Sequence, residues 1–304
     1  MKKIIIFVLC LCLLTSCAVS TPTQSPSALP VPPTAEVTPE PEYEVDIYQF
    51  DFTPENFPRM DGTYSSLPLA QAAASILLSV DRKSVSNHTN FTDNKTALSN
   101  LLNNEADIVF VYAPNGELEA LGDVVEYAAI ATDALVFLVN SSNSVTNLTT
   151  SHIQTIFSST GNSWAAFGGS TSTVVPFLNP ASTVSHSLLK TIMGENSLIE
   201  PTIEYVDGDT GYLSNPSGSA SISYDLYYRS QVLNPDSTQR AIYLDGVAPT
   251  YINIKNGTYP VTCKLYAVIR SSATLNSPER VLYKWLQGEL GQQMIGLEGL
   301  APAK

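Results

Sequence analysis

Residues 61–70 read Asp-Gly-Thr-Tyr-Ser-Ser-Leu-Pro-Leu-Ala, a small polar cluster followed by the start of an apolar run. The run continues to Leu78 as LPLAQAAASILL, and its Ala and Leu content favours a helix. Apolar stretches at 106–112 (ADIVFVY) and 134–140 (ALVFLVN) are typical of buried strands. Short strands and helices alternate in this way from Val45 onward, which predicts an α/β fold.

The same alternation continues toward the C-terminus. Further helices are predicted at 95–103, 150–157, 183–193 and 278–290, and further strands at 174–178, 220–228 and 265–269. Residues 45–304 are enough for one large domain or two ordinary ones.

Residues 1–17 have the layout of a secretory signal, because Lys2 and Lys3 precede an apolar run that ends at Leu14. This run is too short for a spanning helix, which needs about 20 residues. The Leu-Thr-Ser-Cys sequence ending at Cys17 resembles a bacterial lipobox, which implies cleavage and a diacylglycerol on the sulfur. We expect a lipoprotein anchored outside the cytoplasm, on a cell surface of Gram-positive type. An ordinary secretion signal with an incidental cysteine is the alternative.

Residues 18–44 are rich in Pro, Ser, Thr and Ala and poor in clustered apolar side chains, so we expect a disordered tether. Cys10 and Cys12 would leave with the signal and Cys17 would be lipidated, which excludes an intramolecular disulfide. The remaining thiol, Cys263, lies in an apolar stretch and is interpreted as a buried small hydrophobe.

The net charge of −13 argues against a nucleic-acid partner, since such binding draws on clustered Lys and Arg. An acidic exterior does not exclude an anionic ligand, because backbone N–H groups at helix starts can hold an anion locally. His88, His152 and His186 have no zinc-like spacing, and neither a Gly-x-Ser-x-Gly elbow nor a Walker loop is present. The sequence therefore indicates neither an enzyme nor a cofactor.

Several segments, in order, resemble the phosphate-binding-protein branch of the periplasmic-binding-protein superfamily. They are residues 61–70, 105–108, 133–140, 147–149 with 153 and 156–157, 162–164, 168–169, 245–250 and 256–260. The resemblance implies a type II periplasmic-binding-protein (Venus-flytrap) fold, in which two α/β lobes joined by two crossover strands close on a ligand. Lobe 1 would comprise 45–136 plus 259–304, and lobe 2 would comprise 137–258.

The resemblance also implies a site in which hydroxyls and helix-opening amides grip an anion. Thr63, Ser65 and Ser66 stand where the family places its first anion-binding loop, with helix capping as their other interpretation. In the second loop Thr92 and Asn94 stand before a helix, where capping is again the alternative.

Two other family elements differ in this sequence. The Ser-Asp pair that often ends the family's strand is replaced by Val111 and Tyr112, and the phenol of Tyr112 is the remaining candidate there. In the third loop Asn179 replaces the family's Arg, and Val184 replaces its central Gly. Ser182, Thr183 and Ser185 can still donate hydrogen bonds to an oxyanion. We therefore expect a site without a positive side chain, which would weaken phosphate binding roughly 30- to several-thousand-fold.

On this basis the sequence predicts a monomeric solute-binding lipoprotein of an ABC importer, which captures phosphate or a related oxyanion and delivers it to permease subunits. A surface-binding or sensor protein that keeps the fold but serves no transporter is one alternative. A binder of an organic solute is another, with Ser223, Tyr224, Tyr227 and Tyr228 as a wall of the cleft. Packing is the other interpretation of these tyrosines.

Overall fold

A computed structural model describes residues 50–114, 116–199 and 220–303 of the chain. The predictions of a signal peptide, a lipidated Cys17 and a tether lie outside these residues. Within them, no helix combines the length and the apolar character that a membrane crossing requires. Residues from Glu44 to the C-terminus belong to one unit.

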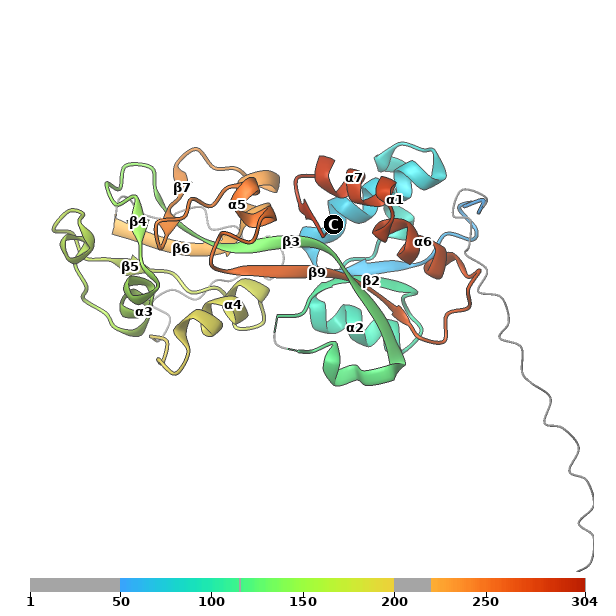
Figure 1. Ribbon diagram of the computed structural model, residues 1–304, viewed down its shortest axis with the longest axis horizontal. Coiled ribbons are helices and arrows are strands. Elements are labelled where there is room, and N and C mark those ends of the chain that lie inside the picture. The colour runs from blue at the N-terminus through green and yellow to red at the C-terminus, as the bar shows by residue number, and fades with distance from the viewer. Residues whose placement is uncertain (1–49, 115, 200–219, 304) are drawn as a thin grey trace, which may run out of the picture. The chain divides into compact units, whose positions relative to one another are not determined.

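The longest strand, β3 (Val125–Asn140), links two parts of a mixed sheet. Its first part pairs antiparallel with β9 (Thr262–Arg270), and its second part pairs with β6 (Ser221–Leu226) and β7 (Gln239–Ala241). Figure 1 shows β3 and β9 side by side between two groups of helices. The strands are ordered β1-β2-β9-β3-β6-β5. A group of helices lies at each end of this sheet (Figure 1).

One group of elements surrounds the end of the sheet formed by β1 (Met60–Gly62) and β2 (Ile108–Tyr112). It contains the 3-10 turns η1 (Tyr64–Ser66), η2 (Arg82–His88) and η3 (Glu119–Val124), the helices α1 (Leu67–Leu78), α2 (Asn94–Leu102), α6 (Pro278–Gln287) and α7 (Glu289–Leu297), and the strand β10 (Ala301–Pro302). All five residues of β2 are buried, as its continuous apolar sequence predicts for a central strand.

The other group surrounds β6 and β7. It contains the strands β4 (Asn147–Leu148), β5 (Val175–Pro176) and β8 (Tyr243–Leu244), the helices α3 (Thr150–Ser158), α4 (Val184–Met193) and α5 (Tyr251–Lys255), the 3-10 turn η4 (Trp164–Phe167) and the π-helix η6 (Tyr228–Leu233). Trp164 is fully buried here, and its indole N–H donates to the Ala220 carbonyl at 2.9 Å.

The predicted α/β class is confirmed, and most predicted helices lie within a residue or two of their observed bounds. The strand predicted at 134–140 is only the end of β3, which begins at Val125. Its first half is rich in Ala and has low intrinsic strand propensity, and pairing with β9 determines its conformation. The helix predicted at 278–290 is two helices, because Gly288 is extended and separates α6 from α7.

The strand predicted at 220–228 also ends early. Tyr227 and Tyr228 leave β6 after Leu226 and begin the π-helix η6. Single-turn π-helices occur frequently at functional sites because they redirect a few side chains. Cys263 is buried, as predicted.

Candidate ligand-binding site

The first loop lies close to the sheet because Gly62 has no side chain. A Cβ at Gly62 would lie 2.4 Å from the Phe110 carbonyl oxygen on β2. The following residues turn into η1 and α1, and the Ser66 hydroxyl donates to the Thr63 carbonyl at 2.7 Å. Ser66 is therefore fully buried and holds the loop's shape. The hydroxyls of Thr63 and Ser65 are 3.4 Å apart, and neither Thr63 nor Ser66 makes a side-chain capping bond.

The second loop is tied to the sheet by Asn94. Its amide nitrogen donates to the Tyr112 carbonyl at 2.6 Å, and its amide oxygen accepts from the Tyr112 N–H at 3.3 Å. The cap of α2 is Asp93, which accepts from the backbone N–H groups of Lys95 and Thr96. Burial opposes ionisation of Asp93, but these hydrogen bonds outweigh it and lower the pKa of the carboxyl.

The third loop opens α4 and is held by a buried network. Thr183 caps the helix by accepting from the His186 N–H at 3.2 Å. The amide of Asn179 donates to the Ser185 hydroxyl at 2.7 Å and to the Tyr224 carbonyl at 2.9 Å. These bonds set the direction of the α4 start and the positions of its hydroxyls.

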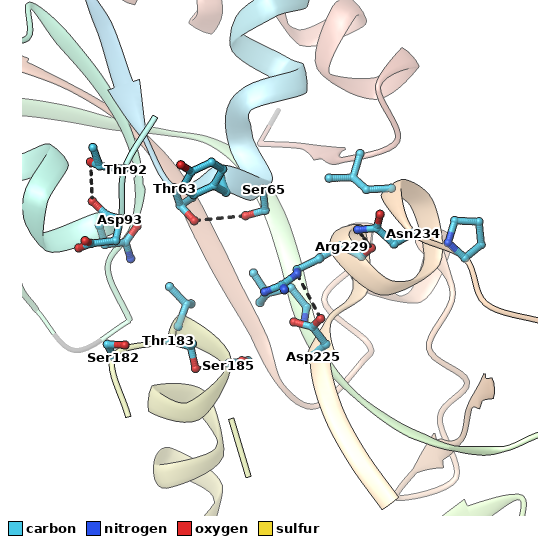
Figure 2. Close-up of a pocket in the computed structure, with 16 residues that line it drawn as sticks. Thr63, Ser65, Thr92, Asp93, Ser182, Thr183, Ser185, Asp225, Arg229 and Asn234 are labelled. Carbon is cyan, nitrogen blue, oxygen red and sulfur yellow. Dashed lines mark hydrogen bonds and ion pairs between the residues drawn. The ribbon is translucent and has the colours of Figure 1, made fainter. Parts of the chain in front are cut away.

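These loops meet at a cavity of about 550 Å³. Its lining consists of Thr63, Tyr64, Ser65, Thr92, Asp93, Asn94, Ser182, Thr183, Val184, Ser185, Asp225, Leu226, Arg229, Leu233, Asn234 and Pro235. Figure 2 shows the hydroxyls of Thr63 and Ser65 across the cavity from Ser182 and Thr183. Side chains more than 100 residues apart in sequence thus converge on one space.

Six of the predicted site residues line this cavity, namely Thr63, Ser65, Asn94, Ser182, Thr183 and Ser185. The structure places the other three outside the lining. Ser66 and Asn179 lie behind it, as described above, and the buried Tyr112 hydroxyl donates to Asp133 at 2.9 Å. Burial and the nearby Asp133 carboxylate raise the pKa of Tyr112 well above its usual value.

The aromatic wall considered for an organic solute is also outside the lining. Tyr224 is fully buried, and its hydroxyl accepts from the Asn179 N–H at 2.9 Å and lies 3.2 Å from the His186 Nδ1. Tyr228 is fully buried as well, and its N–H donates to Asp133 at 3.0 Å. The tyrosine that lines the cavity is Tyr64 from the first loop.

Two charged residues of the cavity, Asp225 and Arg229, were missed in the sequence. Asp225 ends β6 and Arg229 lies in η6, with the Arg229 Nε 3.5 Å from the Asp225 Oδ2. The Arg229 Nη2 is buried and has no hydrogen-bond partner among the described residues. Figure 2 shows the guanidinium reaching from its helix toward Ser65, above Asp225. The expectation of a site without a positive side chain is therefore wrong.

The carboxyl of Asp225 is almost fully buried and accepts from the Leu226 N–H at 2.8 Å. Burial raises its pKa to about 6, although the positive charge of Arg229 opposes the shift. A group with this pKa can exchange a proton near neutral pH. In the described part of the chain, no group of three His, Cys, Asp or Glu side chains is placed to hold a metal ion.

Residues 59–287 match the family described as the PBP superfamily domain. The chain belongs to the PBP superfamily. The two-lobed fold predicted from the sequence is thereby confirmed, whereas the lobe boundaries at 136–137 and 258–259 stay a prediction. No curated protein matches the chain.

Two of the solved structures similar to this chain are described as proteins of phosphate transport. One is described as a phosphate ABC transporter substrate-binding protein with bound phosphate from Clostridium perfringens, at 20% identity and a TM-score of 0.62, covering 81% of this chain and 98% of that one. The other is an ABC-type phosphate transport receptor from Vibrio cholerae, at 19% identity and a TM-score of 0.59, covering 79% and 98%. At these identities the likeness shows the shared fold.

Proposed function

We propose that this protein is the solute-capturing component of an ABC importer and holds phosphate or a related oxyanion in the cavity described above. The observation that carries the proposal is Arg229. Its Nη2 is buried and has no partner in the described part of the chain, and the side chain reaches toward the same space as the hydroxyls of Ser65 and Thr183. A buried, unpaired donor costs free energy, and an anionic oxygen would remove that cost.

The rest of the lining supports an anion in the same way. The start of α4 supplies backbone N–H groups with partial positive charge. At the start of α1 the Leu67 N–H is bonded to the Tyr64 carbonyl and Pro68 has no N–H, so the first loop contributes its hydroxyls. The side chain of Thr63 makes no capping bond and lines the cavity, which supports a role in binding rather than in capping. These local donors act over a few ångströms, where the net charge of −13 has little influence.

Asp225 offers a means of choosing among oxyanions. Its carboxylate lies in the lining beside Arg229 and, when ionised, accepts hydrogen bonds only. A hydrogen phosphate can donate its proton to such a group, whereas sulfate has no proton to donate at neutral pH. An acceptor facing an acceptor in a buried site is penalised, so we expect phosphate to be preferred to sulfate.

Location and partners complete the proposal. Structures of the same fold are described as phosphate transport proteins, which supports an ABC permease as the partner of this chain. The lipobox-like sequence ending at Cys17 supports a lipid anchor outside the cytoplasm. We further propose that the protein acts as a monomer, without a cofactor and without catalysis.

Calorimetric titration of the purified protein tests this function, after unfolding and refolding to remove carried-over ligand. We expect one-to-one binding of phosphate, and sulfate at the same concentration should displace it poorly. No heat at millimolar phosphate or sulfate would overturn the oxyanion proposal. That result would favour the alternative of a surface-binding protein that keeps the fold without a transport role.

A further inference from the structure

The cavity is also lined by aliphatic side chains, with which a bare oxyanion would make no favourable contact. Beyond Arg229 the chain continues through Leu233, Asn234 and Pro235, and all three line the same cavity. Figure 2 shows Asn234 on the side of Arg229 that faces away from Thr92 and Asp93. Leu226 adds a further apolar side chain from the end of β6. The segment from Leu226 to Pro235 therefore gives the cavity aliphatic groups beside Arg229, whereas the loops before α1 and α4 give it hydroxyls.

The size of the cavity leads to the same point. If each non-hydrogen atom takes the roughly 30 Å³ that a water molecule occupies in the liquid, a five-atom oxyanion occupies about 150 Å³. The cavity, which is open to solvent, has about 550 Å³ and so leaves room for a larger ligand. Hinge closure would reduce this volume. It would also bring the apolar side chains closer to the ligand, where they would contact carbon more favourably than a hydrated ion.

Arg229 lies beside these aliphatic groups because of its place in the π-helix. Its Nε faces Asp225 at 3.5 Å, its buried Nη2 has no partner among the described residues, and Leu233 follows one turn later. An anionic head bound at Nη2 would thus lie next to the aliphatic groups. Tyr64, which is 41% exposed at the edge of the cavity, offers an aromatic face to the same ligand.

We propose that the solute is an organic phosphate or phosphonate, with its anionic head at Arg229 and the hydroxyls, and a short aliphatic body against Leu226, Leu233 and Pro235. It binds as the monoanion, which keeps one P–OH proton for the Asp225 carboxylate to accept. This inference rests on the oxyanion function proposed above and names its substrate class. Each methylene buried against these side chains should increase affinity by up to about fourfold.

The test compares inorganic phosphate with methyl, ethyl and propyl phosphate in calorimetric titrations of the purified protein. We expect affinity to rise along the series, with propyl phosphate at least about tenfold tighter than phosphate. Leu233→Ala should remove most of this rise. Pro235→Ser, at an exposed position where folding is not at stake, should reduce the rise in the same direction.

The outcomes separate this inference from the function on which it rests. If phosphate binds as tightly as every ester, the substrate class is wrong and the oxyanion function stands. If the rise is present but Leu233→Ala and Pro235→Ser leave it unchanged, the aliphatic contacts have been misplaced and the inference fails. If neither phosphate nor any ester binds, the oxyanion function itself is wrong.

Discussion

Replacement of Arg229 by Gln is the most informative perturbation of this protein. Gln keeps much of the side chain's length and its hydrogen-bonding ability, but it removes the positive charge. The Arg229 side chain is 20% exposed and that of its partner Asp225 is 7% exposed, so the pair lies mostly out of water. If the cavity holds an anion, the charge should matter for ligand affinity far more than for the fold.

The magnitude follows from one buried donor, the Arg229 Nη2, which has no hydrogen-bond partner among the described residues. A hydrogen bond to a charged group contributes about 1.5–3 kcal/mol, which corresponds to a 10- to 150-fold weaker Kd for phosphate. Stability should fall as well, because Asp225 loses its positive neighbour in a buried position. The distance of 3.5 Å and the partial exposure of Arg229 place this cost at about 1–3 kcal/mol rather than at the upper limit for buried pairs.

Calorimetry gives the Kd and urea unfolding gives the stability. Arg82→Gln is the matched control, since Arg82 is exposed, pairs with Glu298 and lies outside the cavity lining. Asp225→Asn should remove the stability cost, and in that background Arg229→Gln should still weaken phosphate binding at least about tenfold. The reasoning is refuted if folded Arg229→Gln protein binds phosphate within twofold of the wild type.

Three further predictions concern the support of the site. Asn179→Ala should lower the free energy of unfolding in urea by about 1–3 kcal/mol, because it breaks buried hydrogen bonds. The Kd for phosphate should change only about twofold. A large loss of affinity at unchanged stability would instead make Asn179 a ligand contact. Thr183→Ala should lower stability by about 1 kcal/mol through the lost helix cap and weaken phosphate binding about fivefold. Thr183→Ser should keep both the stability and the affinity of the wild type. Equal losses in the two variants would exclude a role for the hydroxyl. The pKa of Asp225 is about 6 in the folded protein and near 3.8 when unfolded, so its protonation stabilises the fold below about pH 6 and this stabilisation is lost as the pH rises through 6. When the pH is lowered from 7 to 5, the free energy of unfolding of the wild type should therefore rise by about 1 kcal/mol relative to that of Asp225→Asn. Parallel pH profiles of urea stability for the two proteins would contradict the raised pKa.

Local sequence patterns were sufficient for the parts of the fold that depend on local interactions. The helix from Leu67 to Leu78 was predicted to the residue, because its composition and its polar start agree with each other. The beginning of β3 was missed because its Ala-rich sequence becomes a strand only through pairing with β9, about 140 residues later in the chain. Long-range pairing of this kind leaves no periodic signal in the strand itself.

The candidate site likewise has residues that the sequence indicated and residues that it did not. Thr63, Ser65 and Thr183 could be found because a helix start with small hydroxyl residues is visible in the sequence. Arg229 could not be found, because the segment containing Asp225 and Tyr228 has the aromatic composition of a strand. In a continuous strand, residues four apart lie about 13 Å from each other, too far for an ion pair. The π-turn after Leu226 brings Asp225 and Arg229 to 3.5 Å.

Arg229 also bears on the replacement of the family's Arg by Asn179, because it supplies a positive charge from another element. A guanidinium in the third loop would belong to α4, whereas Arg229 belongs to a six-residue π-helix that also carries Leu233. Since the charge and the aliphatic side chain are on the same element, a movement of that helix would displace both ends of a bound ligand together. Asn179 holds the start of α4 through Ser185, and the guanidinium of the cavity comes from a segment whose Leu233 is proposed to contact the ligand's body.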